Sequence, residues 1–397
     1  MTRHGWRVIR VTRVAVLAAW LCAMVAPGVR AFTTSDGTAG YLVFPKILVE
    51  PPPGDLNGVR TDTLIQLSNV SDAGLRYVHC FYVDGRSCEY RANFSIELTR
   101  GQPTAWRVSE GLDAGATKIP PVGESFQGEL KCVEVTNPQT LTAAVAQDLK
   151  GEATILRVSP GTPGSVDASS YNAIGFRPVA GTQSEPPAAV PLKCISGNVG
   201  AVCTTPGDDA ACTKDGKAGS CASVLCLGQT DGSPECAVAT HDACPRTVIL
   251  NNFFDDAVDP VAQVPITTRV TFVPCTESLP PGLAAEPRNT LIQFLVFNEF
   301  EQRMSAGTRL QCYKDVQLSR IDSQPGYEKS SIFNVNVQGT LAGQTRMAAV
   351  SGTETNIGRG FVALAEEFHG SAAAAFNLNE QAISSKGDFV RYQAVLE

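Results

Sequence analysis

The stretch "TDTLIQLSN" occupies residues 61–69, and "RNTLIQFLVFN" occupies residues 288–298. Apolar and polar residues alternate through both, which is typical of a strand with one buried face. An apolar strand, a Pro-Pro-Gly turn and a polar loop precede each copy of Thr-Leu-Ile-Gln. Because a recurring order of features is the signature of an internal repeat, we interpret the two stretches as the same strand written twice.

Further features follow in the same order in both halves. After Asn69 and Asn298 come a cysteine, an alternating strand and a Gly-Gln motif, then a last apolar strand: Cys80, "NFSIEL" (93–98), "GQPT" (101–104) and "GELKCVEV" (128–135), against Cys312, "IFNVNV" (332–337), "GQT" (343–345) and "GFVALAEEF" (360–368). This order predicts that Leu64 and Leu291, on an inward-facing strand, occupy equivalent places, as do Gln66 and Gln293. The same alignment matches Glu134 with Glu366.

Short alternating strands in both halves predict an all-β chain of two tandem antiparallel β-sandwiches. The run from Leu64 to Tyr82 resembles the early strands of immunoglobulin-like domains. The tryptophan and paired-cysteine signature of antibody domains is absent, since Trp106 lies in another strand. The resemblance therefore implies an immunoglobulin-like architecture, with a jelly roll as the alternative. One helix is expected at 141–151, where four apolar residues share a helical face.

The N-terminal residues 1–31 have the layout of a secretory signal peptide. Arginines lead into an apolar run at 14–26, and Val29 and Ala31 supply the small residues of a cleavage site. We expect cleavage after Ala31. The run is short for a membrane span, and we expect no transmembrane segment in the mature chain.

Loss of this leader makes the chain strongly acidic. The full sequence has 32 basic and 39 acidic residues, and the leader contains five arginines and no acid, so 27 basic residues remain and the net charge is −12. No basic stripe is left to neutralise phosphates, which argues against nucleic-acid binding.

Between the repeats, a linker at 182–191 leads into a cysteine-rich insertion. We therefore divide the chain into a signal peptide (1–31), a first sandwich (32–181), the linker and insertion (182–244) and a second sandwich (245–397). The insertion has almost no large apolar residues, so disulfides must hold it. The cysteine spacing includes no Cys-x2-Cys pair, which disfavours zinc.

The mature chain has an even count of cysteines, and in an exported protein all are disulfide candidates: Cys80, Cys88, Cys132, Cys194, Cys203, Cys212, Cys221, Cys226, Cys236, Cys244, Cys275 and Cys312. We expect Cys80 to pair with Cys132, Cys275 with Cys312, and Cys88 with a cysteine of the insertion. In its overall organisation the chain resembles exported bacterial proteins that carry tandem immunoglobulin-like sandwiches and a cysteine-rich insertion.

Acidic clusters offer weak candidate sites. Asp208, Asp209 and Asp215 lie near a glycine but lack EF-hand spacing, so they are weak calcium candidates. A second possible cation site is "FFDDAVDP", with Asp255, Asp256 and Asp259.

Signatures of common enzymes are missing from the sequence: it has no H-E-x-x-H, no G-x-S-x-G and no phosphate-binding glycine loop, and we expect no cofactor. Acid–base candidates are Glu366, Glu367 and His369 in "LAEEFHG", and Glu299 with Glu301, which are expected on one strand face.

These observations favour a non-enzymatic protein that is secreted, periplasmic or at the cell surface. We expect its function to be adhesion, envelope or matrix assembly, or ligand capture at the sandwich loops, with a protein or glycan as partner. The alternative is a secreted hydrolase that acts on carbohydrate through acids such as Glu366 or Glu301.

Overall fold

The structure is a computed structural model of the chain. It describes residues 37–50, 60–115, 117–123, 125–138, 143–144, 146–158, 166–178, 192–194, 202–203, 221–222, 239–274, 290–350, 360–380 and 386–392. The chain divides into two units, 1–31 and 32–397, and every described residue belongs to the second. The expected signal peptide and the 182–191 linker lie outside the described residues.

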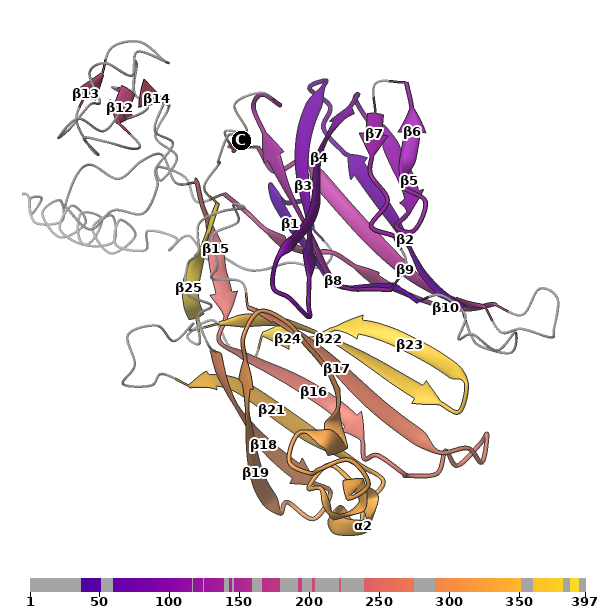
Figure 1. Cartoon of the computed structure of the whole chain (residues 1–397). Coiled ribbons are helices and arrows are strands. Elements are labelled where there is room, and N and C mark those ends of the chain that lie inside the picture. The colour runs from indigo at the N-terminus through magenta and orange to yellow at the C-terminus, as the bar shows by residue number, and fades with distance from the viewer. Residues whose placement is uncertain are drawn as a thin grey trace, which may run out of the picture. The chain divides into compact units, whose positions relative to one another are not determined.

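The first sandwich consists of two antiparallel sheets (Figure 1). In spatial order, one sheet contains β11 (Ile174–Phe176), β1 (Tyr41–Val49), β8 (Phe126–Val135), β3 (Arg76–Asp84) and β4 (Tyr90–Leu98). The other contains β10 (Val166–Asn172), β9 (Leu149–Val158), β2 (Arg60–Asn69) and β5 (Pro103–Arg107). A small hairpin of β6 (Leu112–Ala114) and β7 (Thr117–Ile119) follows β5.

The second sandwich repeats this plan with different strand orders (Figure 1). One sheet contains β19 (Arg303–Leu310), β18 (Thr290–Asn298), β21 (Ala342–Val350), β16 (Thr247–Phe253) and β24 (Asn379–Glu380). The other contains β20 (Lys314–Gln317), β17 (Ile266–Pro274), β22 (Phe361–His369) and β23 (Ala372–Asn377). Between β20 and β21 lie two 3₁₀ turns, η2 (Leu318–Arg320) and η3 (Glu328–Ser330), and one short helix, α2 (Val335–Gln338).

Each pair of sheets encloses its own apolar core. In the first sandwich, Leu42 and Cys132 of one sheet pack with Ile65 and Ile155 of the other. Phe272 and Ile292 belong to the corresponding core of the second sandwich. The prediction of an all-β chain with two antiparallel sandwiches is therefore confirmed. The strand orders of the two sandwiches differ, and their membership of an immunoglobulin-like class stays a prediction.

Three further groups of strands are short. A three-stranded sheet in the insertion contains β13 (Val202–Cys203), β12 (Leu192–Cys194) and β14 (Cys221–Ala222). A separate ribbon pairs β15 (Ala239–Pro245) with β25 (Lys386–Tyr392). Across the part of the chain that the structure describes, no helix has the length and apolar character needed to cross a bilayer.

The two Thr-Leu-Ile-Gln strands, β2 and β18, have the same burial pattern. In each, Thr and Ile are buried, Leu is half-buried and Gln is exposed. Gln66 lies opposite Ala105 of β5, and Gln293 opposite Ala348 of β21. Leu64 and Leu291 match in burial, but β2 lies between β9 and β5 whereas β18 lies between β19 and β21, so their equivalence stays a prediction. In both strands the residue that faces inward is the isoleucine that follows. The leucines lie on the outer face because side chains alternate along a strand.

The helix expected at 141–151 is wrong. Ala143 forms a bridge with Val135, and Leu149 begins strand β9, which pairs with both β2 and β10. Leu149 fits a helical face, but it also begins a period-two run of buried residues that continues past residue 151, where the expected helix ended. Strand pairing on both sides of β9 outweighs the local pattern.

The alignment of the last strands is also wrong, by one residue. In β8, Leu130 and Cys132 face the core of their own sandwich. Their sequence-aligned partners in β22, Val362 and Leu364, face away from the core of the second sandwich and pack with residues of the first. Because strand side chains alternate, a slip of one residue exchanges the two faces. Glu134 and Glu366 are therefore not equivalent.

One face of the sheet that contains β1 packs against the second sandwich. All nine residues of β1 are buried, so both faces of this strand are covered. Tyr41, Val43 and Val133 form an apolar cluster with Val273 and Val362 of the second sandwich. Two covered faces explain why this strand reads as an apolar run and not as an alternation.

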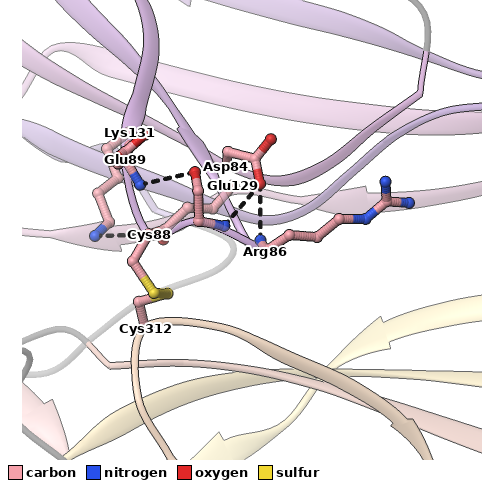
Figure 2. The surroundings of a disulfide bond; sticks show 8 residues. Asp84, Arg86, Cys88, Glu89, Glu129, Lys131 and Cys312 are labelled. Atoms are coloured by element: carbon pink, nitrogen blue, oxygen red, sulfur yellow. Dashed lines mark hydrogen bonds and ion pairs between the residues drawn. A yellow bond between two sulfur atoms is a disulfide. The ribbon is translucent and has the colours of Figure 1, made fainter.

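Two disulfides join described cysteines. Cys80 of β3 bonds to Cys132 of the neighbouring β8, as expected. Cys88, at the turn between β3 and β4, bonds to Cys312, which follows β19 in the second sandwich (Figure 2). The expected partners of Cys88 and Cys312 are thus both wrong, because packing of the sandwiches brings together two positions 224 residues apart.

Other cysteines are only partly described. Cys244 is buried and disulfide-bonded. For Cys194, Cys203 and Cys221 only the backbone is described, within β12, β13 and β14. The remaining candidates lie outside the described residues: Cys212, Cys226, Cys236 and Cys275. Their participation in disulfides stays a prediction, but Cys275 cannot have its expected partner, because Cys312 is bonded to Cys88.

Candidate functional site

Five charged side chains form a cluster between the two sandwiches, here called the charge cluster: Lys46, Arg157, Arg269, Asp315 and Glu366. Lys46 and the two acids are buried, whereas the two arginines reach toward solvent. The Lys46 Nζ lies 3.0 Å from Oδ1 of Asp315 and 2.5 Å from Oε2 of Glu366. Each carboxylate also contacts an arginine: Arg157 pairs with Glu366, and Arg269 pairs with Asp315 at 2.9 Å. Lys46 and Arg157 come from the first sandwich and pair with acids of the second.

A bulge in β1 places Lys46 in this cluster. The register of β1 against β8 shifts between Phe44 and Ile47, so Pro45 and Lys46 depart from regular pairing. Proline cannot donate a ladder hydrogen bond, and bulges redirect side chains. The hydroxyl of Tyr171 accepts a hydrogen bond from the Lys46 backbone N–H at 3.2 Å and donates one to its carbonyl, which fixes the bulge.

Asp315 is held in its charged form by this environment. Burial alone would raise the pKa of Asp315, but the charges of Lys46 and Arg269 outweigh burial and hold it below its ordinary value. The side-chain amide of Gln127 donates to Oδ2 at 3.0 Å, and the Thr271 hydroxyl donates to Oδ1 at 3.2 Å. The carboxylate therefore has the partners that a buried charge requires.

Glu366 occupies a structural position in this cluster. Its side chain is 1% exposed and contacts Lys46 and Arg157 of the first sandwich. Arg157 also stacks over the ring of Phe368, 5.2 Å from its centroid. An acid that is buried and paired with two cations joins the sandwiches, and this is the role that the geometry gives to Glu366.

His369 bridges two carboxylates that the sequence placed in separate motifs. Its Nε2 lies 2.8 Å from Oε1 of Glu367, and its Nδ1 lies 2.5 Å from Oδ2 of Asp259. The hydrogen bond to Glu367 and the bond to Asp259 together raise the pKa of His369. With both ring nitrogens engaged, the arrangement stabilises the imidazolium and ties the end of β22 to the β16–β17 loop.

The three aspartates of "FFDDAVDP" have three separate roles. The buried Asp255 carboxylate accepts hydrogen bonds from the backbone N–H of Thr268 at 2.8 Å and of Ser319 at 2.9 Å. Burial raises the pKa of Asp255. Asp256 accepts from the amide of Asn334 at 2.8 Å, while Asp259 contacts His369. The three carboxylates do not converge on the possible cation site, because each contacts a different neighbour.

The other acidic candidates do not form a site among the described residues. Glu299 and Glu301 lie in the exposed turn after β18 and not on a strand, so the expectation of one strand face is wrong. Asp208, Asp209 and Asp215 lie outside the described residues, and calcium binding there stays a prediction. Within the described ranges, no group of three histidine, cysteine or acidic side chains is placed to hold a metal ion.

A surface pocket opens at the end of the second sandwich where β16, β18 and β20 end. Its volume is about 480 Å³, and we call it the loop pocket. It is lined by one aspartate after β16, one residue of β20 and the loop that follows β20: Asp256, Gln317, Arg320, Gly326, Tyr327, Glu328, Lys329 and Ser330.

Sequence reasoning identified Glu366 but missed the other four members of the charge cluster. Lys46, Arg157 and Asp315 carried no motif, because a contact between two sandwiches depends on the packing of distant strands. "YLVFPKILV" did contain a usable signal: a lysine after a proline, inside an otherwise apolar strand, marks a bulge with a buried charge.

Comparisons with known proteins identify no relative: no protein-family model matches, and no curated protein matches significantly. Among solved structures, Thermotoga maritima 1070 aligns at 10% identity over 35% of this chain and 95% of that chain, with a TM-score of 0.23. The viral chemokine binding protein R17, encoded by rodent gammaherpesvirus Peru, aligns at 9% identity over 88% of this chain and 85% of that chain, with a TM-score of 0.12. Neither likeness supports an inference about function.

Proposed function

We propose that the protein is exported and acts as a rigid, non-enzymatic binding or structural protein outside the cytoplasm. The single observation that carries this proposal is the Cys88–Cys312 disulfide, which joins the two sandwiches across 224 residues of sequence. Disulfides of this kind persist in oxidising compartments such as the periplasm, the cell surface or the medium. The predicted signal peptide at 1–31 supports the same location.

Contacts around this disulfide support a rigid pair of sandwiches. A Cβ at Gly85 would lie 2.4 Å from Cδ1 of Tyr313, so only glycine allows the β3–β4 turn to pack on that ring. The apolar cluster around Tyr41 and Val273 adjoins it. Rigid scaffolds that present loops are well suited to binding, because the loops are positioned before the partner arrives.

The alternative, a hydrolase acting on carbohydrate, relied on acids such as Glu366 and Glu301. Glu366 is paired with Lys46 and Arg157. Glu301 lies in the exposed turn after β18 and outside the charge cluster. A glycosidase requires two carboxyl groups that flank one bond. The described geometry therefore favours a binding or structural role.

Export is tested by expressing the full chain in a host with a secretory pathway. We expect mass spectrometry of the intact protein to give the mass of a chain that begins at Phe32. Peptide mapping without reduction should recover Cys88 linked to Cys312. An uncleaved leader, or free thiols at both cysteines in freshly isolated protein, would contradict the proposal.

Catalysis is tested separately by incubating the mature protein with chromogenic glycosides and polysaccharides. We expect no product above that from a matched preparation of the Glu301→Gln variant. Hydrolysis that disappears in Glu301→Gln would instead establish the alternative.

A further inference from the structure

The loop pocket has a rigid frame. Gln324, Pro325, Gly326 and Tyr327 form a β-turn in which the Tyr327 N–H donates to the Gln324 carbonyl at 3.0 Å. Gly326 has φ +89°, the left-handed value that the third residue of a type II turn requires, and proline at the second position is favoured. The turn therefore fixes where Tyr327 projects.

Polar side chains anchor both ends of this loop. Asp255 accepts from Ser319 N–H at the start of the loop, and Gln317 also donates to it at 3.2 Å. At the far end, Asp322 accepts from Ile332 N–H at 2.9 Å and from the Ser331 hydroxyl. A loop held at several points loses little conformational entropy when a ligand binds.

Tyr327 is exposed although its loop is ordered. Its relative exposure is 68%, and it lies in the pocket wall beside Glu328 and Lys329. The fold gains little from an aromatic ring in water, since burial is what makes such a ring stabilising. A ring face held open in a pocket is a platform on which a ligand can stack.

Polar groups around this ring include both donors and acceptors. Arg320 and Lys329 provide cationic donors, while Asp256 and Glu328 provide anionic acceptors, so the formal charges of the lining cancel. Arg320 Nε already pairs with Oε1 of Glu328 at 3.1 Å, which orients both groups. Hydrogen bonds from charged groups to neutral hydroxyls are stronger than those between neutral groups.

We propose that the loop pocket binds a neutral carbohydrate chain, with Tyr327 stacking on a sugar ring and the surrounding charged side chains bonding its hydroxyls. A balanced lining gives no net attraction to a phosphate or a polyanion, and an open pocket admits part of a longer chain. This inference rests on the proposed role as a binding protein outside the cytoplasm, and it names the class of partner.

Affinity electrophoresis in native gels tests the proposal. The probes are soluble neutral polysaccharides (galactomannan, xylan, laminarin and dextran), with heparin as the anionic arm. We expect retardation by at least one neutral polysaccharide, unchanged by 0.5 M sodium chloride. Retardation by heparin alone, lost in salt, would overturn the proposal, and so would mobility unchanged by every probe.

Variants of two exposed aromatic residues assign the binding to the pocket. Tyr327→Ala should weaken binding at least 10-fold, and Tyr327→Phe should keep it within about threefold because the ring remains. Phe300→Ala is the matched control, since Phe300 is 67% exposed and lies outside the pocket lining. Equal binding by Tyr327→Ala and wild type would overturn the assignment. The leader and disulfide measurements are independent, so export can hold where the glycan proposal fails.

Discussion

Comparison of the two Thr-Leu-Ile-Gln strands shows which features the halves share. Asn69 and Asn298 end β2 and β18, and both are buried. The Asn69 side-chain oxygen accepts from the N–H two residues later at 2.9 Å, and the Asn298 oxygen does so at 3.0 Å. The shared part of each half is thus a strand together with the turn that its last residue organises.

The side-chain amides of Asn69 and Asn298 donate to different kinds of segment in the two halves. Asn69 donates to the carbonyl of Leu98 at the end of strand β4, while Asn298 donates to the carbonyl of Gln338 at the end of helix α2. "IFNVNV" was expected to be a strand like "NFSIEL", and this expectation is wrong: 332–334 form a turn and one isolated bridge, and 335–337 begin α2. The asparagine at the end of the strand therefore makes the same kind of hydrogen bond in both halves, although the segment that accepts it is a strand in one half and a helix in the other.

The strands before the repeat also differ. β1 has a bulge at Pro45 and Lys46, whereas β17 pairs with β22 in continuous register from Ile266 to Pro274. The bulge sends a charge from the first sandwich into the second. The halves are thus alike in their cores and different at the surface where they meet.

Removal of this charge should have the largest effect. Lys46→Met leaves two buried carboxylates short of a cation, so we expect a loss of about 3–5 kcal/mol in the free energy of unfolding. Urea denaturation followed by fluorescence measures it. Lys150→Met, at an exposed lysine of β9, is the control and should change stability by less than about 0.5 kcal/mol. A loss at Lys46 no larger than the control would contradict the role of the cluster.

Truncation of the inward isoleucines tests the equivalence of the cores. Ile65→Ala and Ile292→Ala should each cost about 2–4 kcal/mol and differ by less than about 1 kcal/mol. The matched variants Leu64→Ala and Leu291→Ala remove side chains that are half-buried. They should cost clearly less in urea titrations. A larger loss at the leucines would show that the inward face had been assigned to the wrong residues.

Replacement of the two asparagines tests the anchors. Asn69→Ala and Asn298→Ala leave buried backbone groups without partners, and we expect a loss of about 2 kcal/mol each. Thermal unfolding by calorimetry is the measurement, with the exposed Asn251→Ala as the control. If only one of the two variants is destabilised, the turns are not equivalent.

The smallest effect concerns His79, which only the first sandwich carries. Burial lowers its pKa from 6.5 to about 4. In that range the unfolded chain binds the extra proton, so stability falls as pH drops from 6.5 toward 4. His79→Gln should lessen the change between pH 7.5 and 5.5 by about 1 kcal/mol, measured by urea titration at both values.

A second buried group, Glu134, titrates in the same pH range as His79. Burial raises the pKa of Glu134 to about 7, so its protonation adds stability as pH falls through the same range. The informative quantity is therefore the difference between wild type and His79→Gln at each pH. An identical pH dependence in both would show that His79 is not responsible.

Local pattern predicted the parts of the fold that repeat with period two. The strands β2 and β18 and the all-β class followed from it, although the inward position belongs to Ile65 and Ile292 and not to the leucines. It failed at Leu149, where helical and strand periods coincide, and at Glu366, where a slip of one residue exchanged the faces. Cys88 and Lys46 find their partners only after both sandwiches have formed, so no local pattern contains that information.

The Cys88–Cys312 bond has a mechanical consequence. It lies between the first described strand and the last, and the intervening chain includes the cysteine-rich insertion at 182–244. Tension applied to the two ends of the chain would pass through the bond and bypass the insertion. A protease that cut the insertion once would leave the two halves covalently joined. The connection between the two sandwiches therefore does not depend on the insertion alone.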